Sequence, residues 1–241
     1  MCLTNKLSML KFIFKICLIM KNISKEDYLS IIYKNRDEYG KIKANVIAGK
    51  LSVSGAAVTD MLKKLSKDGY IKYERYKDIH LTPGGEDYAR NMVRRHRIWE
   101  LFLHQIVGMP WNKVHDEANN LEHSGSDELI NRMEELLHFP EFDPHGDPIP
   151  NREGQMPKQR KEVAISELKI GEAGKVVRVN DISGKFLSYL SELGIKINAK
   201  ITVKEKREFD KSMRIVIKGK LWNISGQLAE NVFVEINKTK V

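Results

Sequence analysis

Ser54-Gly-Ala-Ala-Val-Thr-Asp-Met-Leu-Lys-Lys-Leu65 is the stretch that decides the fold of the first part of this chain. Its apolar spacing predicts a helix over residues 54–67 that stops at Asp68-Gly69. A shorter helix over about 42–50 and the turn Leu51–Ser54 precede it, and a helix over 24–39 comes before both. These signals predict a helix-turn-helix.

The residues that follow, Tyr70 to Leu81, alternate between aromatic or aliphatic and charged types. This alternation predicts a two-stranded hairpin, which Thr82-Pro-Gly-Gly85 closes. On the first helix, Ser24 is expected to be the N-cap, and Gly40 ends the helix. The order of elements predicts a winged helix-turn-helix domain over residues 20–89.

Small residues at the start of the 54–67 helix would let its N-terminus approach base edges and phosphates closely. Basic residues on this helix and on the hairpin can supply phosphate contacts, although most charge runs are simply a solvated face. An acidic side chain there can accept from cytosine but repels phosphate. The predicted DNA-contacting residues are Ser54, Ala56, Thr59, Asp60, Lys63, Lys64, Arg75 and Lys77.

The whole chain has 241 residues and a formal charge of +9, which suits two or three domains and a polyanionic partner, nucleic acid ahead of a membrane surface. Residues 1–19 are expected to be a leader or a wrongly assigned N-terminal extension, with Met20 as the initiator. Both cysteines, Cys2 and Cys17, fall in that segment, so the rest of the chain offers no thiolate ligand. The protein is therefore expected in the cytoplasm.

A helical region over residues 90–142 comes next. Its expected helices cover about 86–107, 111–124 and 127–139, with a break at Gly108-Met-Pro110. The last helix carries an apolar stripe formed by Leu129, Ile130, Met133, Leu136 and Leu137. Because a short region with several apolar faces needs a partner, we expect it to form a homodimer interface.

Two of these helices carry residue types that commonly ligate metals. His115, Asn119, Glu122 and His123 share one face of the 111–124 helix, while apolar residues occupy a neighbouring stripe. His96 and Glu100 are four residues apart on the preceding helix and also share a face. This spacing of histidine, asparagine and glutamate predicts a metal site between two helices.

Residues 143–161 are dense in proline, glycine and aspartate, which is typical of a linker or of an irregular wrapped segment. Alternating runs at 174–179, 200–203 and 213–217 then predict a small antiparallel barrel over residues 162–238. The predicted fold is mainly α with small β parts: a winged helix-turn-helix, a helical dimerisation domain and a C-terminal SH3-like β-barrel.

Several motifs follow one another along the chain: Glu26-Asp-Tyr-Leu, the 54–65 stretch, Arg94-Arg-His-Arg, Val114-His-Asp-Glu-Ala, Leu121-Glu-His and Asp143-Pro-His-Gly-Asp-Pro-Ile-Pro. Together they resemble the diphtheria toxin repressor and manganese transport regulator family of metal-dependent transcriptional repressors. The resemblance covers about residues 24–150. The segment after residue 162 resembles the SH3-like domain of longer members, which is also found in ferrous-transport accessory proteins.

The resemblance implies two metal sites. The primary site would consist of Asp27, Asn119, Glu122 and His123, and the ancillary site of His96, Glu100 and His115. The chain departs from the family at Asn119, where a cysteine or glutamate is usual, and at Ser30, where manganese-type members have a second acidic residue. Oxygen and imidazole ligands without sulfur suit Mn(II) or Fe(II), and Asp27 resembles the manganese-type members. Mn(II) is the preferred cofactor and Fe(II) the alternative.

The resemblance implies a repressor, not an enzyme, that metal activates to bind palindromic double-stranded operator DNA as a homodimer and that controls genes of manganese or iron homeostasis. Two alternatives remain from the residues themselves. One is a winged-helix regulator that responds to a nonmetal ligand. The other is a dinuclear metallohydrolase, because histidine and glutamate on paired helices could activate water.

Overall fold

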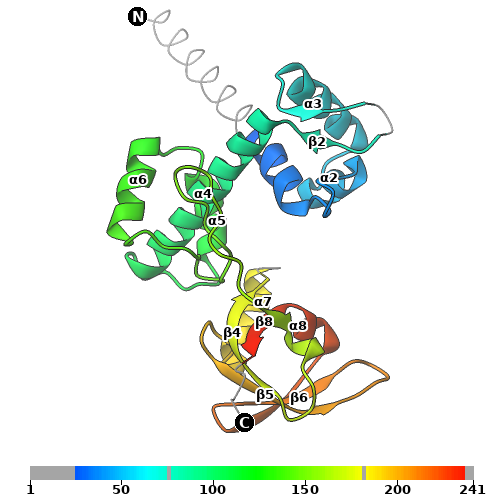
Figure 1. Ribbon diagram of the computed structural model, residues 1–241, viewed down its shortest axis with the longest axis vertical. Helices are drawn as coiled ribbons and strands as arrows, with labels where there is room; N and C mark the ends of the chain where they lie inside the picture. Colours follow the sequence, from blue (N-terminus) through cyan, green and yellow to red (C-terminus); the bar gives the residue numbers. More distant parts are fainter. Residues whose placement is uncertain (1–24, 75–76, 181–182, 237–241) are drawn as a thin grey trace, which may run out of the picture. The chain divides into compact units, whose positions relative to one another are not determined.

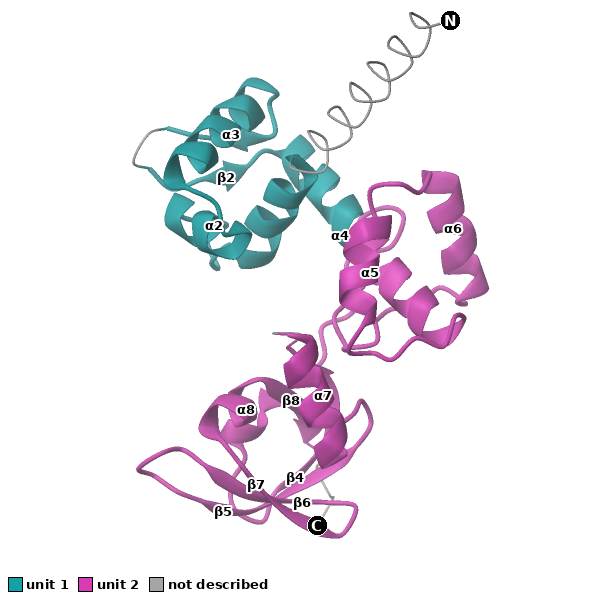
Figure 2. Ribbon diagram, turned by 180° about the vertical axis from the view of Figure 1, so that it is seen from behind, with its two compact units in different colours: residues 1–93 teal, residues 94–241 magenta. Residues whose placement is uncertain are grey.

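The computed structural model describes residues 25–74, 77–180 and 183–236, and the chain divides into two compact units that meet in sequence at Val93 and Arg94 (Figures 1 and 2). The expected leader, Ser24 and Arg75 lie outside the described residues. Within the described ranges, the structure contains no helix of the length and apolarity that a membrane span requires.

The first unit is a winged helix-turn-helix. A helix covers residues 25–35 and is followed by α2 (Ala44–Leu51), α3 (Gly55–Lys67), β1 (Ile71–Lys72), β2 (His80–Leu81) and the start of α4 (Pro83–Gln105). The two short strands are antiparallel, with Ile71 opposite Leu81. One core joins these elements, and its fully buried members include Leu29, Ile47 and Leu62. The helix-turn-helix and hairpin predictions are therefore confirmed.

Two helix boundaries differ from the prediction. The first helix ends at residue 35 and not at Tyr39, because the carboxylate of Asp37 accepts hydrogen bonds from the backbone N–H groups of Tyr39 and Lys41. Tyr39 is exposed and does not extend the apolar face. The segment expected to close the hairpin instead begins α4 at Pro83, where Thr82 Oγ1 accepts from the backbone N–H of Gly85 at 3.1 Å.

The second unit begins within α4 and contains two further helices, α5 (Val114–Leu121) and α6 (Asp127–Leu136). Both are shorter than expected. The residues before α5 form a turn, and Ser126 caps α6 by accepting from the backbone N–H of Leu129 at 3.2 Å. The apolar stripe of α6 divides: Ile130 and Met133 are buried, whereas Leu129 and Leu136 are exposed.

The segment after α6 is packed. Asp143, His145 and Ile149 are buried. Of the two alternatives, a linker or an irregular wrapped segment, residues 143–150 therefore match the wrapped segment. Gly146 has φ +92°, and a side chain there would meet the carbonyl oxygen of Val177 at 2.1 Å. Only glycine allows the segment to approach the following domain this closely.

The final domain is an antiparallel sheet with short helices. Its elements are β3 (Val163–Ala164), η1 (Ile165–Glu167), β4 (Ala173–Val179), α7 (Gly184–Leu193), β5 (Lys200–Lys206), β6 (Met213–Ile217), β7 (Lys220–Ile224), α8 (Gly226–Glu230) and β8 (Val232–Ile236). Among the described residues the strand order is β3-β8-β4-β5-β6-β7, with β3 and β7 at open edges, which fits an SH3-like domain. Trp111, from the turn before α5, belongs to the core of this domain.

Candidate metal centre

The motif Arg94-Arg-His-Arg97 on α4 fixes the surroundings of the candidate site. Arg94 donates to the carboxylate of Glu134 on α6 at 2.7 Å, and both side chains are buried. Arg95 donates from Nε to the carbonyl oxygen of Glu122 at 2.9 Å. The guanidinium of Arg97 lies 3.6 Å from Asp143 of the wrapped segment. The three arginines thus tie α6, the end of α5 and the wrapped segment to the helix that carries His96.

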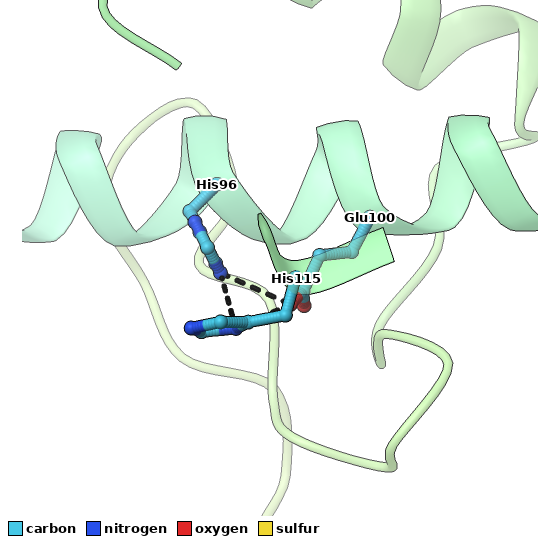
Figure 3. A group of neighbouring side chains, drawn as sticks. All are labelled: His96, Glu100 and His115. Atoms are coloured by element: carbon cyan, nitrogen blue, oxygen red, sulfur yellow. Dashed lines mark hydrogen bonds and ion pairs between the residues drawn. The ribbon is translucent and has the colours of Figure 1, made fainter. Parts of the chain in front are cut away.

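His96, Glu100 and His115 point toward one another, two from α4 and one from α5 (Figure 3). His96 Nε2 lies 3.0 Å from Glu100 Oε1 and 3.2 Å from His115 Nδ1, and His115 Nδ1 lies 3.0 Å from the same Glu100 oxygen. His96 and Glu100 are buried, whereas the side chain of His115 is 38% exposed. The structure therefore brings the predicted ancillary set together, with His115 on its solvent side.

Glu122 sets the orientation of His96. Its Oε2 lies 2.5 Å from His96 Nδ1, and its Oε1 lies 3.4 Å from His123 Nε2. Because a carboxylate accepts, His96 donates from Nδ1 to Glu122, and a neutral His96 then carries its lone pair on Nε2. His96 Nε2 faces the Glu100 and His115 atoms. A partner that fixes the tautomer of a metal-binding histidine in this way is common around metal sites.

The remaining members of the predicted primary site are distributed differently. Asn119 is exposed on α5, and Glu122 and His123 lie at the end of that helix. Asp27 belongs to the first helix of the other unit. Its association with Asn119, Glu122 and His123 stays a prediction.

His145 and Asp143 belong to the motif Asp143-Pro-His-Gly-Asp-Pro-Ile-Pro and were not predicted as site residues. His145 is fully buried, and its Nδ1 lies 3.8 Å from Glu100 Oε2. Ligand atoms of Glu100, Asp143 and His145 all fall within 4.8 Å of one another. Neither residue belongs to a periodic pattern, so no helical spacing could have identified them. Their only sequence signal was the motif they share.

Burial and the charges of this region shift three pKa values, and burial together with Glu100 raises the pKa of Asp143 to about 7. Burial raises the pKa of Glu100, but His96, His115 and His145 outweigh it and hold that pKa well below its ordinary value. Burial lowers the pKa of His145, but the proximity of Glu100 and Asp143 and the hydrogen bond to the Trp111 carbonyl raise it to about 9. Glu100 is thus ionised at neutral pH.

These donors fit a divalent cation. Two imidazole nitrogens and one carboxylate oxygen converge at 3.0–3.2 Å in a partly buried place, and a neutral His96 would direct its lone pair at an ionised carboxylate. Such a cluster needs either a proton or a cation between its members. Imidazole and carboxylate together suit Mn(II), Fe(II) and Zn(II).

The predicted DNA-contacting residues lie mostly on one side of α3. Val58, Leu62 and Leu65 of this helix are buried in the core of the unit. Thr59 is half-buried, and the other predicted residues that the structure describes are exposed: Ser54, Ala56, Asp60, Lys63, Lys64 and Lys77. Ser54 is also the N-cap, and its Oγ accepts from the backbone N–H of Ala57 at 3.2 Å.

Three known domain families match the chain in succession. Residues 22–79 match the iron dependent repressor N-terminal DNA binding domain, residues 82–151 the iron dependent repressor metal binding and dimerisation domain, and residues 163–236 the FeoA domain. The HTH-type transcriptional regulator MntR of Bacillus pumilus strain SAFR-032 is 38% identical over 120 residues, which are 50% of this chain and 83% of that protein.

Solved structures agree with these matches. A manganese-dependent transcriptional repressor in complex with manganese is 32% identical, with a TM-score of 0.80 over 88% of this chain and 99% of the other. ScaR with bound Zn²⁺ is 30% identical, with a TM-score of 0.72 over 88% of this chain and 98% of the other. The chain belongs to the iron-dependent repressor family of metal-dependent transcriptional regulators, in the form that carries a C-terminal FeoA domain.

Proposed function

We propose that this protein is a manganese-activated repressor that binds palindromic operator DNA as a homodimer in the cytoplasm and controls genes of manganese or iron homeostasis. The observation that carries the proposal is the partly buried triangle formed by His96 Nε2, Glu100 Oε1 and His115 Nδ1. It lies in the part of the chain that matches the metal binding and dimerisation domain. Helix α4, which supplies two of its members, begins in the DNA-binding unit.

The choice of metal follows from the donors. Carboxylate oxygen and imidazole nitrogen without sulfur favour Mn(II) or Fe(II) over metals that prefer thiolates, and Asp27 resembles the manganese-type members of the family. A bound ion would supply positive charge to an ionised carboxylate and join α4 to α5. Fe(II) is the alternative, and Zn(II) competes on affinity alone.

A second ion is proposed at Asp27, Asn119, Glu122 and His123. Because Asp27 belongs to the DNA-binding unit, an ion held by this set would select the arrangement of the units that binds DNA. A shift from mostly inactive to mostly active protein requires about 5.5 kcal/mol of differential binding. Linkage then requires operator DNA to tighten metal binding by the same factor.

The homodimer is proposed to form through the helical region. Leu129 and Leu136 of α6 are 43% and 55% exposed, and Ile106 and Val107, just after α4, are 50% and 57% exposed. Apolar side chains left on the surface of a short helical region are typical of an interface with a second copy. Two copies would present two α3 helices to successive major grooves, about 34 Å apart.

Operator binding with and without Mn(II) tests this function. Wild-type protein is expected to bind operator DNA more tightly with Mn(II), and the variant Glu122→Ala with His123→Ala is expected to lose this dependence. His104→Ala is a matched control, because His104 is on α4 and its ring bonds the carbonyl oxygen of Met109, outside the proposed metal sites. Equal affinity for wild type and variant, with and without metal, would refute metal activation.

A further inference from the structure

A pocket of about 350 Å³ lies where the chain after α6 approaches the FeoA domain. Its walls come from residues 142–148, from residues 156–162 and from Arg178 of β4. None of the residues of the proposed metal sites or of the proposed DNA contacts lines it. Small-molecule sites have volumes of about 300–1,000 Å³, so the pocket is large enough for a compact organic ligand.

Hydrogen bonds hold one wall of this pocket in place. Phe142 and Pro148 form an antiparallel bridge, and the backbone N–H of Asp143 donates to the carbonyl oxygen of Asp147 at 2.9 Å. Arg97 of α4 donates to the carbonyl oxygen of Pro148. Because this wall is already ordered, a ligand would lose little binding energy to arranging it.

The charged side chains give the pocket a positive surplus. Three basic residues line it, Lys158, Arg160 and Arg178. Among the described residues that line it, Glu162 alone is acidic. Arg178 is already engaged, because its Nε donates to Glu162 Oε1 at 2.6 Å and its Nη1 donates to Asn180 Oδ1 at 2.7 Å. The charges of Lys158 and Arg160 therefore remain to attract an anion.

Arg160 presents its donors in a fixed orientation. Its Nη1 donates to the carbonyl oxygen of Val177 at 3.0 Å, and its guanidinium carbon lies 3.3 Å from the centre of the Phe142 ring. A guanidinium has five N–H donors in one rigid plane. The structure records no second acceptor for this group among the described residues. Its remaining donors can therefore bind a carboxylate through two parallel hydrogen bonds.

Apolar side chains complete the pocket. Pro148 and Pro157 are half-buried, and Met156 is 45% exposed. An inorganic anion would bind the guanidinium but would leave these three side chains in water. A carboxylate attached to an apolar body would bind the guanidinium and also cover the apolar wall.

We propose that this pocket binds a small organic carboxylate. Arg160 binds the carboxylate group, and the two prolines and Met156 contact the apolar body. Because the walls belong both to the wrapped segment and to the FeoA domain, the bound ligand stabilises the contact between them. The proposal does not depend on metal binding and gives the protein a second class of ligand.

Three probes of the full-length protein, without added metal, test the chemistry of the pocket. The first is para-trifluoromethylbenzoate, followed by its fluorine NMR signal. The second, para-trifluoromethylbenzamide, keeps the apolar body without the charge, and the third, inorganic phosphate, keeps a charge without the body. Because each of the last two lacks one kind of contact, we expect the benzoate to bind at least about tenfold more tightly than either.

The methyl group of Met156 reports where the benzoate binds. In protein with carbon-13-labelled methionine methyl groups, the signal that Met156→Leu removes is expected to shift as the benzoate is added. Arg160→Gln is expected to lower the affinity by about 10–100-fold, because it removes charge-assisted hydrogen bonds. Arg207→Gln is the matched control and is expected to bind as wild type does, because Arg207 is in the same domain but does not line the pocket.

Four results would overturn the proposal: equal binding of benzoate and benzamide, equal binding of benzoate and phosphate, an unmoved Met156 signal, or wild-type affinity in Arg160→Gln. An equal loss in Arg160→Gln and Arg207→Gln would also overturn it, since a general charge effect would then explain the binding. The other methionine signals show whether Arg160→Gln is folded. If it is not, the comparison of the three probes on wild-type protein decides alone.

Discussion

Glu122→Gln tests whether one carboxylate supports both proposed metal sites. Glu122 is a proposed ligand of the primary ion, and its bond to His96 Nδ1 at 2.5 Å orients a ligand of the ancillary ion. Glutamine keeps the size of the side chain but replaces a charge-assisted hydrogen bond by a neutral one. Hydrogen bonds to charged groups contribute about 1.5–3 kcal/mol and neutral ones about 0.5–1.5 kcal/mol. The difference, about 1–1.5 kcal/mol, corresponds to about a tenfold loss of affinity.

The assay is Mn(II) titration, with the ancillary ions identified as those that His115→Ala removes. Glu122→Gln is expected to lower the affinity for these ions about tenfold and to abolish binding of the primary ions. Glu117→Gln is the matched control, because Glu117 is exposed on the same helix α5. If Glu122→Gln and Glu117→Gln leave the ancillary ions equally unaffected, the bond between Glu122 and His96 does not orient the histidine and the reasoning is refuted.

Three further predictions concern other parts of the molecule. Lys64→Ala is expected to weaken binding to all DNA sequences alike and to reduce the slope of log affinity against log salt by about 1, which fluorescence titration at several salt concentrations measures; an unchanged slope would exclude a phosphate contact. Leu136→Glu is expected to yield monomers in sedimentation without lowering the stability of the fold, because Leu136 is exposed; a persistent dimer would place the interface elsewhere. In metal-free protein the pKa of His145 is raised from 6.5 to about 9, so its contribution to the free energy of unfolding is present below pH 6.5 and is lost as the pH rises through about 9. Urea denaturation at pH 6.5 and 9.5 measures this loss, and equal free energies of unfolding at the two pH values would contradict the predicted sign.

The sequence predicted the elements whose signals are local. Ser54 before an apolar periodic run and Asp68-Gly69 after it marked α3 within one residue at its start. Strand β6 was predicted with its observed bounds, since alternation and flanking turn residues agree there. The pair His96 and Glu100 was likewise readable, because helical spacing alone puts both on one face.

The features that the sequence did not reveal depend on contacts across the fold. The first helix ends early because Asp37 binds backbone N–H groups, which competes with further helix. His145 lies in a segment without periodicity, and its place beside Glu100 follows only from the approach of that segment to α4. Asn119 was placed in the primary set by resemblance, and its exposure on α5 leaves that role to experiment.

Trp111 has a consequence for any attempt to dissect this protein. The indole is only 8% exposed, donates from Nε1 to Ser191 Oγ on α7 at 2.7 Å and packs in the core of the FeoA domain, although it precedes α5 in the chain. Trimming the polypeptide after residue 151 would uncover this ring and remove the acceptor of its N–H group. A shortened protein would therefore expose an apolar ring beside the Trp111 carbonyl group that accepts a hydrogen bond from His145. Any change in its metal affinity would then not measure what the missing domain contributes in the intact molecule.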